Sequence, residues 1–390
     1  MKIAYVATWN LGRDDAVCRK FEKQVSEWLD LGHDARVFAI TENIPLRKEM
    51  VDISTSCVRD GNTKGLWANI KKFFAALGYW SSVSTSINDW GADVVYLRQQ
   101  SWSPGVNRLL KSIPTVIEIN SRDLAEADIL RRQSGLRGLL LHYYRCYTRN
   151  MLYRNASGLV AVTHELLNAE DFAKYDLPGI VSPNSVKFTS EDRNSTISNR
   201  EQKEKPTVIM VAAHGRAQVG NHWHGIDKIL KLAENSCDQL DFIIVGDASV
   251  AELNPGNNVE VLPRVSPDAL HSLYQRVDVA FGTLALHRKK MDEACPFKVR
   301  EALSKGLPVI LGCLDTAFFE GEAPEWILQL PNNEDNVERH QELIIQFCKK
   351  WMGKRIPLNE VKPFIDSQVI ESEKLMFLES VAKGRSYLLS

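Results

Sequence analysis

Two glutamates flank the predicted start of a helix in the segment EACPFKVREALSKGLP. Seven residues separate Glu293 from Glu301, and Pro296 stands between them, where proline suits a first helical position. We therefore expect Glu293 in the loop ahead of the helix and Glu301 inside it. A helix N-terminus attracts anions through its free N–H groups and its dipole, and Lys298 and Arg300 add positive charge. A carboxylate can accept hydrogen bonds from two neighbouring hydroxyls, so the segment predicts a site for a diphosphate that carries sugar hydroxyls. The alternative is that both glutamates are solvated surface charges.

The elements that must position these residues alternate between strands and helices along the chain. Hydrophobic periodicity predicts a first series of strands at residues 2–7, 35–40, 92–97, 114–119, 158–162 and 180–184, with a helix at 15–31. A second series of strands is predicted at residues 207–212, 241–246, 259–262, 277–281 and 307–311, with helices that include 266–276 and 296–304. Parallel strands need helical crossovers, so the pattern indicates an α/β fold of two Rossmann-like, doubly wound parallel-sheet domains facing across a cleft.

A polar, Ser/Asn-rich connector at residues 187–205 divides the two series. We expect an N-terminal domain over residues 1–186 and a C-terminal domain over residues 206–366. The last helix, at about 367–390, is expected to pack back on the first domain. Ligands of such sheets bind at the carboxyl ends of the strands.

Composition excludes several classes of protein. The 390 residues carry a formal net charge of −1, which gives no global attraction to nucleic acid. The seven cysteines show no Cys-x-x-Cys spacing, which argues against a disulfide framework or a zinc site and favours the cytoplasm. The first residues do not resemble a signal peptide, and no apolar run is long enough to span a bilayer. No Asp-x-Asp motif occurs, so we expect neither a metal nor another cofactor.

The glutamate segment resembles glycosyltransferase family 4, whose members are retaining enzymes of the GT-B fold. The shared pattern is the two glutamates with seven residues between them, followed here by SKGLPV. The resemblance implies that Glu293 faces the donor sugar and that Glu301 holds the ribose of a nucleotide-sugar donor. It also implies that backbone N–H groups near Cys295 and Phe297 meet the phosphates. The C-terminal domain would then bind the donor, and the N-terminal domain the acceptor.

Further segments match the family in order. Gly246 and Asp247 in VGDA resemble the turn that lets the nucleotide approach the backbone, or else form an ordinary strand-end turn. The segment PNSV at residues 183–186 resembles the family's hinge segment, with Ser185 in place of the usual glycine.

The cations that would neutralise the diphosphate depart from the family pattern. Arg216 is present, but His224-Gly225 stands where many members have Lys-Gly. Lys298 and Arg288 are then candidates to supply the missing charge. The alternative for His224 and its neighbour His222 is an exposed loop position without a role.

In the first domain, polar residues follow two predicted strands. Gly12 closes the first strand-to-helix turn, and Glu118, Asn120 and Arg122 stand at the end of the strand at 114–119. We expect Glu118 or Arg122 to contact the acceptor or the donor sugar. A hydrogen-bonded strand-end network is the alternative.

Two segments suggest contact with a membrane surface. Residues 64–80 place aromatic residues on one broad face, and residues 131–154 hold six arginines, four tyrosines and no acid. Basic residues mixed with aromatics suit anionic headgroups, although a core-facing and a solvated helix would explain the same patterns. If the membrane reading holds, the acceptor is a lipid-linked saccharide, and family analogy suggests bacterial surface polysaccharide synthesis on the inner face of the cytoplasmic membrane.

Three other functions fit parts of the pattern. A nicotinamide-dependent oxidoreductase is disfavoured because neither domain's first turn has Gly-x-Gly-x-x-Gly. A nucleotide-sugar epimerase of the GT-B fold and a non-catalytic sugar-binding paralogue stay open as alternatives.

Overall fold

The computed structural model describes residues 1–12, 16–45, 48–58, 66–124, 128, 131, 135–188, 204–212, 222–246, 250, 255–318, 321 and 323–384. Within these ranges, only the backbone is described at residues 16, 58, 66–77, 135–137 and 222. The chain folds as two compact units. Unit 1 is Met1–Ser182 with Ser367–Ser390, and unit 2 is Pro183–Asp366.

Unit 1 is built on a seven-stranded parallel sheet in the order β3-β2-β1-β4-β5-β6-β7. Its strands are β1 (Lys2–Thr8), β2 (Asp34–Thr41), β3 (Ser54–Val58), β4 (Val94–Arg98), β5 (Thr115–Ile119), β6 (Gly158–Ala161) and β7 (Gly179–Val181). Because β1 pairs with both β2 and β4, the strand order reverses between β1 and β4. Such a reversal opens a crevice at the carboxyl ends of the two strands.

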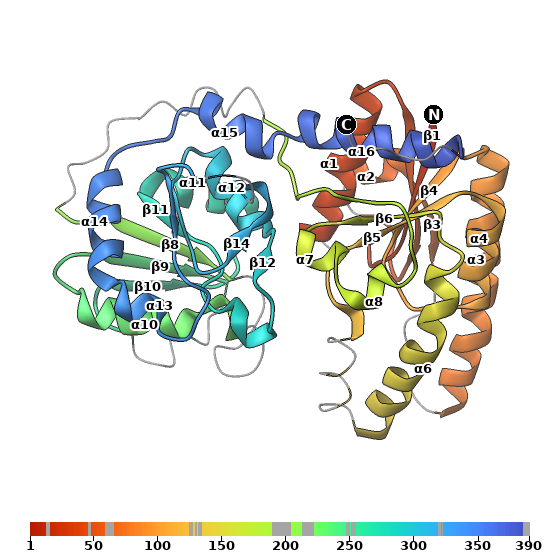
Figure 1. Cartoon of the computed structure of the whole chain (residues 1–390), viewed down its shortest axis with the longest axis horizontal. Coiled ribbons are helices and arrows are strands. Elements are labelled where there is room, and N and C mark those ends of the chain that lie inside the picture. Colours follow the sequence, from red (N-terminus) through yellow and green to blue (C-terminus); the bar gives the residue numbers. More distant parts are fainter. Residues whose placement is uncertain are drawn as a thin grey trace. The chain divides into compact units, whose positions relative to one another are not determined.

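Helices cover both faces of this sheet (Figure 1). They are α1 (Ala16–Asp30), α2 (Lys48–Ile53), α3 (Leu66–Trp90), α4 (Pro104–Ser112), α6 (Gly135–Tyr153), α7 (His164–Leu167), α8 (Glu170–Ala173) and α16 (Ser367–Ala382). Ile3 and Tyr5 of β1 share a buried cluster with Phe21 and Trp28 of α1 and Phe377 of α16. Since strand side chains alternate between faces, α1 and α16 cover this face, and α3 and α4 lie side by side on the other (Figure 1).

The last helix, α16, is held on unit 1 by buried polar contacts as well as by apolar packing. The Glu371 carboxylate accepts a hydrogen bond of 2.8 Å from the Trp28 indole and pairs with Lys374 at 2.8 Å. The Ser367 hydroxyl donates to Glu27 at 2.7 Å. The division between the units falls after Ser182 rather than at residue 186, and most of the predicted connector, residues 189–203, lies outside the described residues.

Unit 2 repeats the architecture with a six-stranded parallel sheet in the order β10-β9-β8-β11-β13-β15. Its strands are β8 (Thr207–Val211), β9 (Asp241–Val245), β10 (Val259–Leu262), β11 (Val279–Phe281), β13 (Val309–Leu311) and β15 (Ile327–Gln329), with β12 (Glu293–Ala294) and β14 (Leu314–Asp315) as a separate pair. Its helices are α10 (Ile226–Asn235), α11 (Pro267–Arg276), α12 (Phe297–Ser304), α13 (Asn336–Arg339), α14 (Gln341–Trp351) and α15 (Leu358–Ile365), with 3-10 turns η1 (His222–His224), η3 (Leu286–Lys289) and η4 (Thr316–Phe318). The strand order reverses between β8 and β11, so the ligand-binding crevice of unit 2 is expected at their carboxyl ends.

Candidate functional site

The start of α12 differs in detail from the sequence prediction. Glu293 lies in the short strand β12, where it pairs with Leu314, and not in a loop. Pro296 is the N-cap of α12, one position before the first helical residue, with φ −79° and ψ 136°. Because proline's fixed φ suits both positions, the sequence could not separate them. Proline has no side-chain acceptor, so Pro296 itself does not cap the helix.

The backbone ahead of α12 is fixed by an asparagine from the start of unit 2. The Asn184 amide nitrogen Nδ2 donates to the Cys295 carbonyl at 2.5 Å, and the Asn184 backbone N–H donates to Cys295 Sγ at 2.9 Å. Asn184 therefore positions the backbone at which the predicted phosphate contacts would lie.

Lys298 and Arg300 have different environments, and Arg300 does not serve as predicted. Arg300 is fully buried, and its guanidinium forms two hydrogen bonds with Asp315, at 2.6 and 2.8 Å. It also donates to the Asn184 carbonyl at 2.8 Å and to Cys295 Sγ at 2.8 Å. The charge of Arg300 is thus neutralised inside the unit, and its role is to hold β14, Asn184 and Cys295 together.

Lys298 keeps its amine beside the helix start. Its Nζ lies 3.1 Å from Met210 Sδ and 3.3 Å from His224 Nδ1, and no carboxylate contacts it among the residues that the structure describes. Burial lowers the pKa of Lys298 to about 7. An amine that is buried without a counter-ion gains most from an arriving anion, because the anion removes the cause of the lowered pKa.

His224 and Gly225 form the turn from η1 into α10. Gly225 has φ 77°, and a Cβ built on it would lie 2.8 Å from Leu284 Cβ, so both conformation and space require glycine there. Leu284 N–H donates to the His224 carbonyl at 3.3 Å, which ties the turn to the chain after β11. The structure therefore brings His224 and Lys298 together across the reversal of strand order, although they are far apart in the sequence.

The two glutamates are both at α12, with different exposure. Glu293 is 2% exposed, and Glu301 is half-buried on α12. Burial and the nearby Glu301 carboxylate raise the pKa of Tyr274 on α11. The alternative that both glutamates are solvated is wrong for Glu293. Phe297, the first residue of α12, is half-buried beside them.

Arg288 is not available as a free cation. Its guanidinium makes hydrogen bonds to both Asp227 oxygens, at 2.9 and 2.7 Å, and is paired with Glu334 as well. Gly246 follows β9 with φ 107°, which places it at the carboxyl edge of the sheet. Arg216, Asp247 and the His222 side chain lie outside the described part of the chain.

Glu118 lies in a buried network, which corrects the prediction that it faces a ligand. It is 1% exposed, and its carboxylate pairs with Lys20 at 2.5 Å and accepts from the Tyr5 hydroxyl at 2.7 Å. Burial would raise the pKa of Glu118, but the Lys20 ammonium and the Arg98 guanidinium outweigh it and lower the pKa to about 2. Glu118 therefore belongs to a hydrogen-bonded network at the strand end, which was the alternative given by the sequence.

The other residues predicted in unit 1 surround this network. Asn120 accepts a hydrogen bond of 3.0 Å from the Lys20 ammonium. Arg122 is half-buried beyond the end of β5. A Cβ on Gly12 would lie 2.6 Å from Asn43 Cβ, so Gly12 is required by its neighbour in the protein. Thr8 and Gln100 also meet across the reversal between β1 and β4, where the Thr8 hydroxyl donates to the Gln100 amide oxygen at 2.9 Å.

The two segments predicted to touch a membrane are only partly exposed. In the first, Trp80 is 5% exposed and packs on Gly105 of α4, while residues 64 and 65 and the side chains of 66–77 lie outside the description. In the second, Arg149 is 4% exposed and pairs with Asp123 and Asp171. Arg149 is therefore unavailable to headgroups. Within the described ranges, no helix is both long and apolar enough to cross a bilayer, and no cluster of three metal-binding side chains occurs.

Residues 192–315 match the family model described as Glycosyl transferases group 1. The matched range contains Glu293, Cys295, Lys298 and Glu301. The match lies within unit 2 and indicates that the chain is a glycosyltransferase. No curated protein matches the chain.

The fold of this glycosyltransferase is GT-B, as its solved structural neighbours show. A glycosyltransferase from Rickettsia africae is 15% identical with a TM-score of 0.64, and the match covers 98% of each chain. The lipopolysaccharide outer core galactosyltransferase WaaB is 13% identical with a TM-score of 0.61, over 97% of this chain and 100% of that one. Anabaena HepE, solved with UDP and glucose, is 13% identical with a TM-score of 0.59, over 97% of this chain and 100% of that one. At these identities the likeness establishes the fold.

Proposed function

We propose that this glycosyltransferase is a retaining, family 4-like enzyme that moves a sugar from a nucleotide-diphosphate sugar to a lipid-linked saccharide acceptor. The observation that carries the donor assignment is the Lys298 amine, which lies within reach of His224 at the start of α12 and has no carboxylate partner in the described residues. A diphosphate bound there would pair with the Lys298 ammonium and would also be stabilised by the positive end of the helix dipole.

The residues in α12 and just before it have distinct parts in this proposal. Lys298 and the backbone around Cys295 and Phe297 bind the diphosphate and stabilise its charge as the sugar leaves. Glu301 accepts hydrogen bonds from the ribose diol. Glu293 lies beside the sugar ring and stabilises its developing positive charge. The leaving phosphate accepts the acceptor's proton, so the new bond forms on the same face as the old one. No metal is required in this scheme.

The experiment that tests the donor assignment is a thermal-shift panel of UDP-, GDP-, ADP- and dTDP-sugars. A ligand that binds only the folded chain raises its melting temperature by mass action. We expect at least one nucleotide sugar to shift the wild type and Glu301→Ala to lose most of that shift, since hydrogen bonds to a carboxylate contribute about 1.5–3 kcal/mol.

The matched control is Glu360→Ala, an exposed glutamate on α15 in the same unit. It should retain the full shift. A Glu301→Ala variant that binds as tightly as the wild type would contradict the ribose assignment. Incubating the labelled nucleotide sugar without acceptor separates transfer from epimerisation, because only an epimerase would convert it alone.

The lowered pKa of Lys298 predicts a pH dependence of donor binding. The pKa of about 7 means that the amine is charged below pH 7 and loses its charge as the pH rises. Because a diphosphate favours the ammonium, affinity should be constant below pH 7 and then fall, by up to about tenfold per pH unit. Calorimetry at pH 8 in Tris and in HEPES should show uptake of one proton on binding.

Two variants of Lys298 separate charge from shape. Lys298→Arg stays charged at every pH used, so its affinity should be independent of pH. Lys298→Gln should bind roughly 10–100-fold more weakly, also without pH dependence. If Lys298→Gln kept the wild-type pH profile, another group would be responsible.

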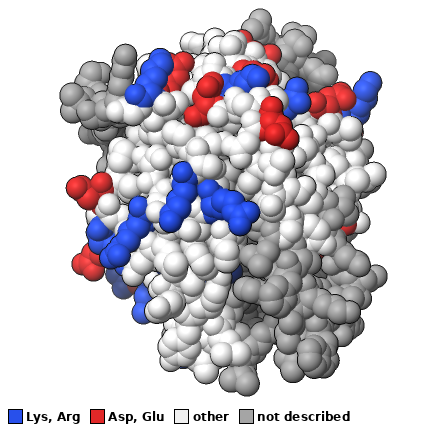
Figure 2. All heavy atoms as spheres, turned by 90° about the vertical axis from the view of Figure 1, so that its right-hand side faces the viewer, with Lys and Arg blue, Asp and Glu red and all other residues white. Residues whose placement is uncertain are grey.

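The membrane part of the proposal is supported by an exposed apolar stripe on α6. Leu140, Tyr143, Tyr147 and Met151 are 63%, 63%, 82% and 41% exposed, and their spacing of three and four residues puts them on one face of the helix. Figure 2 shows lysines and arginines gathered across the middle of the side of unit 1 on which α3 and α4 lie. Exposed apolar rings and exposed basic residues are both features that suit the interface of an anionic membrane. We therefore place the protein on the cytoplasmic face of a bacterial membrane, in surface polysaccharide synthesis.

Vesicle sedimentation tests this surface. The variant Tyr143→Ser/Tyr147→Ser should bind phosphatidylglycerol vesicles roughly 30-fold more weakly than the wild type, because each ring loses on the order of 1 kcal/mol of apolar burial. The control Val369→Ser/Met376→Ser removes two comparably exposed apolar residues from α16 and should bind normally. Equal binding by both double variants would contradict the proposed surface.

A further inference from the structure

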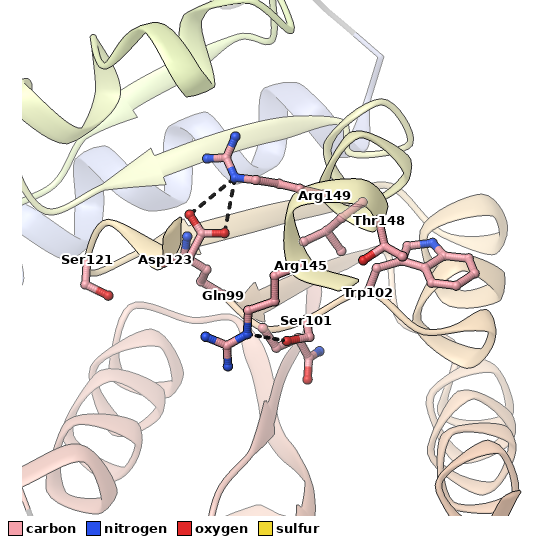
Figure 3. Close-up of a pocket in the computed structure, with 10 residues that line it drawn as sticks. Gln99, Ser101, Trp102, Ser121, Asp123, Arg145, Thr148 and Arg149 are labelled. Atoms are coloured by element: carbon pink, nitrogen blue, oxygen red, sulfur yellow. Dashed lines mark hydrogen bonds and ion pairs between the residues drawn. The ribbon is translucent and has the colours of Figure 1, made fainter. Parts of the chain in front are cut away.

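A pocket lies within unit 1, at the carboxyl ends of β4 and β5 against α6 (Figure 3). Its lining includes Gln100, Ser101, Trp102, Ser121, Asp123 and Arg145, and we call it the α6 pocket. Its cavity volume is about 100 Å³. Because small-molecule sites usually have roughly 300–1,000 Å³, the α6 pocket holds part of a saccharide rather than a whole one.

One wall of the α6 pocket is held rigid by a buried arginine. The Arg149 Nε donates to both Asp123 oxygens, at 3.3 and 3.1 Å, and the opposite side of its guanidinium pairs with Asp171 at 3.1 Å. The rings of Tyr153 and Phe172 lie 4.7 and 4.2 Å from its guanidinium carbon. The Asp123 carboxylate is therefore fixed in place and neutralised by Arg149, and it can still accept hydrogen bonds.

Arg145 contributes a charge to the pocket that no described carboxylate neutralises. Its Nε donates to the Ser101 hydroxyl at 3.1 Å, which orients the guanidinium. Its two terminal nitrogens form no ion pair or hydrogen bond with any residue that the structure describes, and they point into the pocket beneath Asp123 (Figure 3). Nearby, Gln100 Nε2 is buried without a hydrogen-bond partner in the described chain. A buried donor without a partner is costly, so a ligand acceptor would stabilise it.

We propose that the α6 pocket binds the acceptor through an anionic group on its sugar, a carboxylate or a phosphate. The planar Arg145 guanidinium matches either group with two parallel hydrogen bonds. Asp123 accepts hydrogen bonds from the sugar's hydroxyls, and the Gln100 amide donates to a ring substituent. This assignment rests on the proposed function, and it makes the acceptor an acidic or phosphorylated saccharide.

Direct binding to the full chain tests the assignment without turnover. Ligand-observed NMR would compare glucuronate, glucose 6-phosphate and neutral glucose. We expect at least one anionic sugar to bind about tenfold or more tightly than glucose, since charge-assisted hydrogen bonds contribute about 1.5–3 kcal/mol. The two anionic probes show whether the pocket prefers a carboxylate or a phosphate.

Variants assign the preference to one side chain. Arg145→Gln should abolish the preference for the anionic sugar, and Arg145→Lys should retain part of it as a point charge. Arg108→Gln, which removes an exposed arginine from α4 outside the pocket, should leave the preference unchanged. Equal binding of anionic and neutral sugars, an unaltered preference in Arg145→Gln, or no binding of either anionic probe would overturn the assignment.

The nucleotide-sugar panel keeps this outcome separate from that of the proposed function. If Arg145→Gln shows the wild-type thermal shift with the donor but no preference for anionic sugars, both proposals stand. If the wild type binds no nucleotide sugar and still prefers an anionic sugar, the proposed function fails and the pocket assignment stands. If the donor binds but no anionic sugar is preferred, only the pocket assignment fails.

Discussion

Replacing Glu293 by Gln is expected to lower the rate of sugar transfer about 10²–10³-fold while donor affinity changes little. The carboxylate is 2% exposed, so water screens it poorly, and its charge would act strongly on a sugar ring that becomes cationic as the diphosphate leaves. Glutamine keeps the shape and removes the charge. Because the effect belongs to the transition state, it should lower kcat and kcat/KM by the same factor.

The measurement is steady-state transfer from the nucleotide sugar that the thermal-shift panel identifies. Donor affinity is measured alongside by calorimetry, so that loss of turnover can be separated from loss of binding. Glu360→Gln is the control, since Glu360 is exposed on α15 and should leave both values at the wild-type level. If the Glu293→Gln variant had the wild-type kcat, the Glu293 carboxylate would have no part in the chemical step.

Replacing Arg300 by Met is expected to lower the free energy of unfolding of unit 2 by about 3–5 kcal/mol. Methionine fills a similar volume, but Asp315 would keep a buried charge without the guanidinium that holds both its oxygens. The change would also remove the donors to Asn184 and Cys295, so the backbone ahead of α12 should become less ordered. Urea unfolding followed by circular dichroism measures the loss.

Two further variants show that the buried pair is the cause. Arg300→Met/Asp315→Leu removes both charges and should regain much of the lost stability, because no unpaired charge is left inside. Arg339→Met breaks an exposed pair with Asp335 and should change stability by no more than about 1 kcal/mol. If Arg300→Met and Arg339→Met lost the same free energy of unfolding, the buried pair would contribute no more to stability than the exposed one.

Much of the fold could be predicted because its elements are long, apolar and regularly spaced. The strand at residues 259–262 was predicted with the bounds of β10, and the strand at 2–7 differs from β1 by one residue. The short elements α2, β3 and β15 were not anticipated, since the amphipathic pattern of so few residues is weak. The α6 pocket was missed as well, although the polar run from Gln99 to Trp102 directly after a strand was a usable signal.

By itself, the sequence determined the α/β alternation, the placement of two glutamates around a helix start and the resemblance to a glycosyltransferase. Only the tertiary structure decided which charges are free for chemistry. Lys298 and Arg300 are two residues apart, so they point to opposite sides of α12, and nothing local says which side faces the interior. Arg300 pairs with Asp315 in the interior of unit 2. Glu118 accepts a hydrogen bond from Tyr5, which lies on a strand 113 residues earlier. Such partners meet only when the sheets assemble, because a charge is buried or left available by contacts that are distant in the sequence.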